Sequence, residues 1–333
     1  MQGSTQGKIG ARILLLCGII SILVLSFGFL ASGQQGAPAV GAANRDDRVY
    51  RSGTTISVHS DLVLIPVTVT DRSGKVVSGL DKDCFTLFEN NTKQEITHFA
   101  TEDAPISVGI VFDTSDSMQP RMRQAREAVY TLLDNANPSD EFLLVRFSTE
   151  ARIVVPLTSQ VDEIRSRVGS LHVSGTTALL DGVRLALAEM KHAQHDRKAL
   201  VIISDGEDNA SFWTSDQLKA AAREEDVLLY AIRIGDSAET IYPMPTQQAG
   251  IALLKDITNQ TGGRLFEVSK LKQLPEVAAK IGGWLRSQYI LGYASNNSEK
   301  DGGYRRVELK IERPKGFPRL QAVWRKGYYA PKE

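Results

Sequence analysis

Side chains that carry oxygen atoms gather in three short segments of the sequence. The first, residues 113–117, reads DTSDS and carries one carboxylate and two hydroxyls at alternate positions. The others read SGTT at 174–177 and DGEDN at 205–209. A hard cation such as Mg²⁺ takes about six oxygen ligands, keeps several waters and needs few carboxylates. The three segments therefore predict a divalent-cation site, provided that the fold brings them together.

Four apolar runs of strand length alternate with helical segments through the middle of the chain. The runs are ISVGIVF at 106–112, EFLLVRF at 141–147, ALVIIS at 199–204 and VLLYAIRI at 227–234. Runs this apolar are typical of strands that are covered on both faces. Between them, apolar residues recur with helical spacing, as in 122–132 and 179–190. The pattern predicts an α/β fold with a doubly wound, mostly parallel sheet flanked by helices.

Shorter segments complete this α/β domain, which is expected to span 104–286. Residues 152–157 follow the second run too closely for a crossover, so we expect them to pair with it as an antiparallel hairpin. A helix near 249–260, a short strand at 264–268 and a helix around 271–287 come next. A pair of glycines ends the first of these helices.

The two carboxylates Asp113 and Asp205 each follow a predicted strand directly. In an open parallel sheet, ligands collect beyond the carboxyl ends of the strands, where the strand order reverses. Glu207 and Asp208 stand further along the third segment and are expected to be solvated. Ser and Asp are also common helix caps, so the first segment alone is weak evidence for a metal site. Thr177 could likewise be only a helix cap.

Strand-like sequence returns on both sides of the α/β domain. Before it, β-branched and aromatic runs are separated by turn residues at 61–70, 84–90 and 95–100, and after it similar runs stand at 288–294, 306–312 and 320–329. Neither flank has enough strands to be stable alone. We therefore expect 54–103 and 287–333 to form one small β-sandwich-like unit. The alternative is two separate hairpins packed on the α/β domain.

The three oxygen-bearing segments resemble the loops of the metal-ion-dependent adhesion site of von Willebrand factor A domains. IVFDTSDSM at 110–118, GTTALLDGV at 175–183 and VIISDGEDN at 201–209 match in order and in strand context. The resemblance implies a fold of that family and a divalent cation, Mg²⁺ first and Mn²⁺ or Ca²⁺ as alternatives. Its implied ligands are Asp113, Ser115, Ser117, Thr177 and Asp205.

Two details of the motif are specific to this chain. Thr177 is chosen over Thr176 because the family's Thr stands five residues before a glycine that is Gly182 here. Asp116 replaces the glycine often found between the two serines, which adds negative charge without removing a ligand.

The resemblance also implies a function. In this family the remaining position of the metal accepts an acidic residue of a partner, which indicates an adhesion or protein-binding module and not an enzyme. The expected partner is a protein that presents Asp or Glu to the metal, with no role for nucleic acid. The flanks, including QYILGY at 288–293 and GYY at 327–329, resemble exported bacterial proteins of this group, in which a β extension surrounds the domain.

Two other functions stay open at this point. In an envelope-assembly scaffold, the metal would only join the three loops while the β unit docks. In a metal-dependent hydrolase, Asp113 would be the nucleophile, but Ser115 stands where the second Asp of such a pair is expected. His192 and His195 lie three apart at a helix end, where they favour a charge interaction with the helix over metal binding.

An uncharged apolar stretch at 13–30 follows Lys8 and Arg12 and leads into the small residues of 31–33. It reads as a signal peptide cleaved after Gly33, although eighteen residues also reach the lower limit for a signal anchor. Residues 34–53 read as a flexible linker. The rest of the chain is therefore expected to be exported: periplasmic, extracellular or anchored at the outer face of the cytoplasmic membrane.

Composition narrows the class of protein. Lys plus Arg and Asp plus Glu both number 39, so no overall positive field favours nucleic acid. Hydrophobic residues make up 42% of the chain, which is typical of a globular protein. Of the two cysteines, Cys17 lies inside the apolar stretch, so Cys84 has no partner for an internal disulfide in the exported part.

Overall fold

The structure is a computed structural model that describes residues 62–101, 104–235 and 245–332. The signal peptide or anchor, the linker and the first residues of the N-terminal flank, all expected within 1–61, lie outside the described residues. In the described part, no helix combines the length and apolar character needed to cross a membrane.

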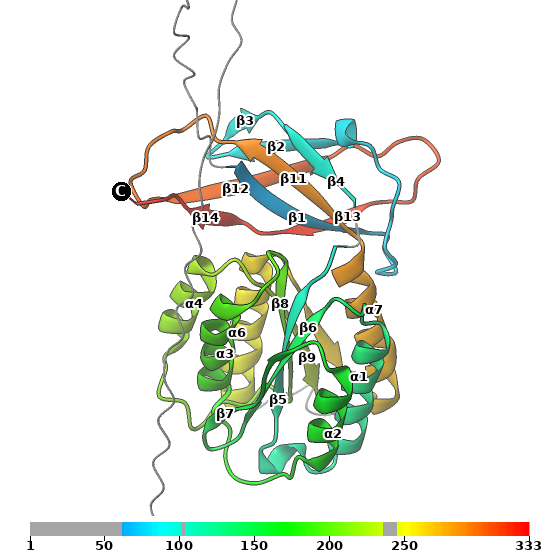
Figure 1. Cartoon of the computed structure of the whole chain (residues 1–333), viewed down its shortest axis with the longest axis vertical. Helices are drawn as coiled ribbons and strands as arrows, with labels where there is room; N and C mark the ends of the chain where they lie inside the picture. The colour runs from blue at the N-terminus through cyan, green and yellow to red at the C-terminus, as the bar shows by residue number, and fades with distance from the viewer. Residues whose placement is uncertain (1–61, 102–103, 236–244, 333) are drawn as a thin grey trace, which may run out of the picture. The chain divides into compact units, whose positions relative to one another are not determined.

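A six-stranded sheet forms the centre of the α/β part (Figure 1). Its strand order is β10-β9-β8-β5-β6-β7, and all neighbours are parallel except β7, which runs antiparallel to β6. The predicted fold class and the predicted hairpin are both confirmed. The strands are β5 (Ser107–Asp113), β6 (Glu141–Phe147), β7 (Ala151–Thr158), β8 (Lys198–Ser204), β9 (Leu228–Ile234) and β10 (Leu265–Val268).

Helices cover both faces of this sheet, and each face has its own apolar core. One face packs against α1 (Met122–Asp134), α2 (Val161–Ser170) and α7 (Leu274–Arg286). The other packs against α3 (Leu179–Glu189), α4 (Ser215–Glu224) and α6 (Pro245–Thr261). Short 3₁₀ turns stand at Lys82–Cys84, Asp116–Met118, Met190–His192 and Leu271–Gln273.

The ends of two helices follow directly from the sequence. Gly262 has a φ of +90° immediately after α6, so the predicted end of this helix at the paired glycines is confirmed. Thr214 and Gln217 form a reciprocal capping box at the start of α4, a helix that the sequence analysis did not predict.

Two four-stranded antiparallel sheets make up the β unit, in the orders β13-β1-β11-β4 and β14-β12-β2-β3. Strands of the two flanks pair directly, β1 with β11 and β2 with β12. One expectation is wrong: 320–329 is not one strand but two, and each joins a different sheet. The strands are β1 (Leu62–Thr70), β2 (Phe85–Glu89), β3 (Thr92–Gln94), β4 (His98–Ala100), β11 (Gln288–Ala294), β12 (Tyr304–Ile311), β13 (Gln321–Trp324) and β14 (Gly327–Tyr329).

The tyrosines of the C-terminal motifs tie the two flanks together around Glu89. This residue is buried at the end of β2 and accepts hydrogen bonds from the hydroxyls of Tyr293 at 2.8 Å and Tyr328 at 2.7 Å. Ser295 donates a third, at 2.7 Å. The hydroxyl of Tyr289 donates to the carbonyl oxygen of Val77 at 2.9 Å. A buried carboxylate needs such partners, so these motifs have a structural role in the β unit.

The strand order places the candidate site. The chain passes from β5 to β6 on one side and returns to β8 on the other, so the order reverses at β5. Asp113 is the last residue of β5, and Asp205 directly follows β8. Both carboxylates therefore lie at the edge of the sheet where ligands collect in this class of fold.

Candidate metal centre

The first loop holds Asp113 and its two serines close together. Asp113 is fully buried, and its Oδ1 accepts hydrogen bonds from the backbone N–H of Ser115 at 2.9 Å and from the Ser115 hydroxyl at 2.6 Å. The hydroxyl oxygens of Ser115 and Ser117 are 3.1 Å apart. The other oxygen, Oδ2, accepts from the Ser204 hydroxyl at 2.6 Å. Asp113 therefore orients both Ser115 and the end of β8.

The third loop contributes a carboxylate that is only partly engaged. Asp205 is 1% exposed, and its Oδ1 accepts from the backbone N–H of Glu207 at 3.2 Å. Its Oδ2 is buried without a hydrogen-bond partner. The nearest cationic atom is Nη1 of Arg121, 3.6 Å away, and this nitrogen donates to the carbonyl oxygen of Ser117 at 2.6 Å. A buried carboxylate oxygen in this condition is costly unless a cation joins it.

Backbone hydrogen bonds join the three loops. Asp116 N–H donates to the carbonyl of Gly175 at 2.9 Å, which links the first loop to the second. The N–H of Asn209 donates to the carbonyl of Thr177 at 2.9 Å, and the Asn209 side chain accepts from Thr177 N–H at 2.8 Å. Gly175 has a φ of +83°, and a Cβ there would lie 2.3 Å from Oγ1 of Thr149. The second loop therefore needs glycine at this position.

Thr176 and Thr177 have different surroundings. The Thr176 hydroxyl donates a hydrogen bond to Oγ1 of Thr149 at 3.1 Å, and Thr176 is exposed. Thr177, in contrast, is 1% exposed. Thr177 does not cap α3. Asp208 does so from the third loop, because its Oδ1 accepts from the N–H of Leu179 at 2.9 Å.

Asp208 is therefore not simply solvated, as the sequence suggested. Its Oδ1 also accepts from the Ser211 hydroxyl at 2.5 Å. Burial raises the pKa of this carboxyl, and its hydrogen bonds with Ser211, Leu180 and Leu179 oppose that shift. Asp208 joins the third loop to the start of α3 and does not belong to the metal-binding set.

The electrostatics of the site favour a bound cation. Burial, together with the charge of Asp205, raises the pKa of Asp113 to about 7, in spite of the hydrogen bonds from Ser115 and Ser204. Two carboxylates in a dry site repel each other, and a divalent cation between them would remove that repulsion.

The donor atoms suit a hard cation. In the described part of the chain, no three His, Cys, Asp or Glu side chains are grouped to hold a metal. A site here would therefore depend on hydroxyls as well as on Asp113 and Asp205. A set of only carboxylate and hydroxyl oxygens, without nitrogen or sulfur, fits Mg²⁺, Mn²⁺ or Ca²⁺ better than a soft metal.

Four residues near the site were missed by the sequence analysis: Ser204, Arg121, Asn209 and Arg233, whose buried Nε donates to the backbone carbonyl of Asp205 at 3.2 Å. Ser204 stands directly before Asp205, and that adjacency was the one available signal. Arg121 precedes α1 and Asn209 ends the DGEDN segment, but their contacts join segments far apart in the chain. No local pattern reveals such contacts.

Comparisons with known proteins identify a family for the α/β part of the chain. The family model of the von Willebrand factor type A domain matches residues 107–280, slightly more than half of the chain. An uncharacterized protein of Borreliella burgdorferi is 25% identical over 199 residues, which cover 54% of this chain and 57% of that protein. Inter-alpha-trypsin inhibitor heavy chain H4 of Bos taurus is 30% identical over 116 residues, covering 31% of this chain and 13% of that protein. The chain thus matches little more than half of the first relative and a small part of the second.

The comparison with solved structures gives matches at low sequence identity. A von Willebrand factor type A protein from Catenulispora acidiphila is 15% identical, with a TM-score of 0.48, and the match covers 83% of this chain and 75% of that one. Proximal thread matrix protein 1 from the mussel byssus, solved with zinc in its adhesion-site motif, is 18% identical with a TM-score of 0.47. That match covers 60% of this chain and 50% of the mussel protein.

Proposed function

Since the chain belongs to the von Willebrand factor type A domain family, we propose that it is an exported protein-binding module that holds a divalent cation and uses it to coordinate an acidic residue of a protein partner. Mg²⁺ is the proposed ion, with Mn²⁺ and Ca²⁺ as alternatives. The proposed ligands are Asp113, Ser115, Ser117, Thr177 and Asp205.

One observation carries this proposal: buried carboxylates and hydroxyls meet at the carboxyl ends of β5 and β8, and one carboxylate oxygen has no hydrogen bond there. That oxygen is Oδ2 of Asp205. Asp113 holds the Ser115 hydroxyl at 2.6 Å, so the ligand oxygens are fixed before an ion arrives. Such preorganisation lowers the cost of binding.

The ligand set leaves the ion able to attract a further carboxylate. If both aspartates act through water while the hydroxyls of Ser115, Ser117 and Thr177 ligate directly, the ion stays electrophilic toward an incoming carboxylate. The five side chains supply fewer oxygens than a full shell of six if each gives one. An incoming Asp or Glu can therefore complete the shell, and the ion supplies the Lewis acidity that attracts it.

The structure favours binding over the two alternatives. In a hydrolase, Asp113 would have to act as a nucleophile, but both of its oxygens accept hydroxyl hydrogen bonds, from Ser115 and Ser204. In a scaffold, the metal would be needed to join the loops, but hydrogen bonds through Gly175 and Thr177 already join them. We therefore propose that the protein is not an enzyme.

Export is proposed from the sequence of residues 1–33. The charged start, the apolar stretch and the small residues before 34 are those of a signal peptide or signal anchor. A partner would then be met in the periplasm, outside the cell or at the outer face of the cytoplasmic membrane.

A selection from a displayed peptide library tests the proposal. The 34–333 fragment is the bait, and the selection is made once with Mg²⁺ and once with a chelator. We expect Mg²⁺-dependent peptides that lose binding when their Asp or Glu is exchanged for Asn or Gln. Asp113→Asn in the bait should abolish capture. Asp216→Asn, at an exposed position in the first turn of α4, should leave it unchanged. Peptides that bind equally well in chelator, or that lack any required acidic residue, would contradict the proposal.

A further inference from the structure

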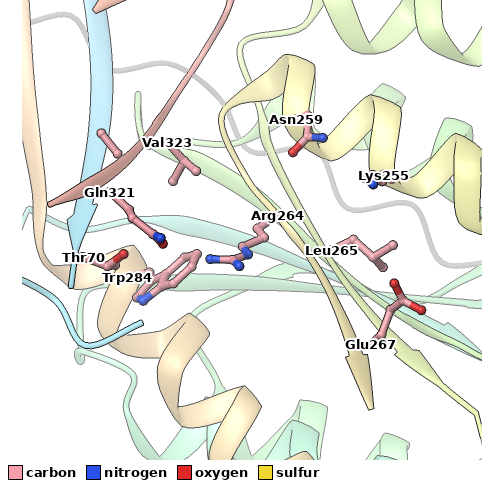
Figure 2. A pocket seen from close by; sticks show the side chains of 10 residues that line it. Thr70, Lys255, Asn259, Arg264, Leu265, Glu267, Trp284, Gln321 and Val323 are labelled. Atoms are coloured by element: carbon pink, nitrogen blue, oxygen red, sulfur yellow. The ribbon is translucent and has the colours of Figure 1, made fainter. Parts of the chain in front are cut away.

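A polar cavity that shares no residue with the candidate metal centre lies between the edges of two sheets (Figure 2). β10 is the last strand of the six-stranded sheet, and β13 is the last strand of one sheet of the β unit. Among the described residues no further strand pairs with either edge, and residues of α6 and α7 line the cavity as well. The cavity has a volume of about 460 Å³, which is within the range of small-molecule sites.

The polar lining of this cavity carries more positive than negative charge. It contains Arg264, Lys255 and one acid, Glu267, together with the side-chain amides of Asn259 and Gln321. Within 62–101, 104–235 and 245–332, no carboxylate forms an ion pair with either cation, although Glu267 lines the same cavity. The next acid on α6, Asp256, is paired with Lys219 at 2.9 Å.

Arg264 is held in place by aromatic rings. Its guanidinium carbon lies 5.7 Å from the ring centroid of Trp284 and 5.9 Å from that of Phe266. Figure 2 shows the guanidinium directed toward the indole. The indole itself is fixed, because its N–H donates to the carbonyl of Gly74 at 3.0 Å and the side chain is buried. An arginine fixed over aromatic rings keeps its planar donor groups for a bidentate acceptor.

The remaining wall of the cavity is apolar. Ala322 and Val323 of β13 line it, whereas Leu265 of β10 packs on the opposite face of the sheet from Trp284. A charged end and an apolar wall in one small cavity suit a ligand that has a carboxylate and a short hydrocarbon body. A bare inorganic anion would leave the apolar wall uncovered.

From these observations we infer that this cavity is a binding site for a small organic carboxylate, which places its carboxylate on Arg264 and its hydrocarbon body against Ala322 and Val323. Lys255 supports the carboxylate through its charge. The inference does not depend on the metal centre, because the two sites share no residue.

Saturation-transfer NMR on the full-length protein tests the inference, with 3-methylbutanoate as the probe and the neutral 3-methylbutanamide as its matched control. We expect saturable binding of the carboxylate with a dissociation constant of about 1 mM, the range for a few favourable contacts. The amide should bind at least about tenfold more weakly, because it lacks the charge that makes the Arg264 hydrogen bonds strong. Chelator should change neither result.

Arg264→Gln should raise the dissociation constant of the carboxylate at least about tenfold. Arg264 is exposed, so this variant is expected to fold. Arg313→Gln, at another exposed position outside the cavity, should leave binding unchanged. Equal binding of acid and amide, or unchanged binding in Arg264→Gln, would overturn the inference. Inorganic phosphate should not displace the probe at low concentration. If phosphate displaces it at concentrations far below the dissociation constant of the probe, the cavity is a site for inorganic anions and the inference is overturned.

Discussion

Arg121 is the cation closest to the proposed metal ligands, and its removal should strengthen metal binding. Its Nη1 lies 3.6 Å from Oδ2 of Asp205, and the two side chains are 11% and 1% exposed. A divalent cation that binds Asp205 must therefore enter against the positive charge of Arg121. Arg121→Gln removes that charge and leaves a shorter, uncharged polar side chain.

The magnitude follows from the distance between the charges. Opposite unit charges 3.6 Å apart attract each other by about 1 kcal/mol in bulk water and by about 5 kcal/mol at an effective dielectric constant of about 20. Arg121 lies at the boundary between these environments. Because it can move away from an entering ion, we expect a net gain of about 1–3 kcal/mol, or about 5- to 150-fold in the dissociation constant of Mg²⁺.

Calorimetric titration of the metal-stripped protein with Mg²⁺ measures this effect. Arg123→Gln is the matched control, because Arg123 stands two residues further along the chain in α1, is exposed and pairs with Glu127. In the absence of metal, Arg121→Gln should also lower the melting temperature, since it removes the cation 3.6 Å from the Asp205 carboxylate and leaves only Arg233, whose Nε donates to the backbone carbonyl of Asp205, beside that residue. If Mg²⁺ affinity in Arg121→Gln is unchanged or weaker, Arg121 supports the site and does not compete with the ion, and the reasoning fails.

Further predictions concern packing, pH and the β unit. Gly182→Ala should destabilise the protein by about 1–3 kcal/mol, because a Cβ there would lie 2.8 Å from the ring of Phe147. Its control, Gly283→Ala in α7, meets no atom within 4 Å and should stabilise by about 0.5–1 kcal/mol in urea unfolding. Burial lowers the pKa of Lys326 from 10.5 to about 8, so the unfolded chain binds more protons between these values and stability should rise with pH across that window. Lys326→Met should flatten this rise in unfolding curves taken from pH 7 to pH 10, and an equal rise in both proteins would refute the assignment. Removal of all residues after Leu285 should abolish amide protection in β1–β4 but leave it in β5, as hydrogen exchange can show; protected β1–β4 would contradict our proposal that 54–103 and 287–333 form one unit.

The sequence predicted those parts of the fold whose signals are local. The runs of β5, β8 and β9 are apolar on both faces because helices cover both faces of the sheet, and their length and alternation with helical segments identified them as strands. α2 was missed because only Ile164 and Val168 of its ten residues are buried, so its helical periodicity is weak. The division of 320–329 into β13 and β14 depends on partners in two different sheets, which the run of residues itself does not show.

In the candidate site, too, the sequence predicted the features that depend on local spacing and missed those that depend on long-range contacts. The spacing of Asp113, Ser115 and Ser117 was readable because a tight loop after a strand places alternate side chains together. The role of Ser204 depends on a hydrogen bond to a residue 91 positions away. The contact of Arg121 with Asp205 likewise depends on the neighbouring positions of β5 and β8. Such long-range contacts come from the fold and not from the local sequence.

The central claim is that Asp113 and Asp205 hold a divalent cation, and calorimetric titration of the chelator-stripped 34–333 fragment with Mg²⁺, Mn²⁺ and Ca²⁺ tests it most directly. We expect saturable binding of one ion per chain. Binding should be lost in Asp113→Asn, which should remain folded because it relieves the repulsion between two buried carboxylates, and retained in Asp216→Asn. Absence of binding by the wild-type fragment, or equal binding by Asp113→Asn, would contradict the account.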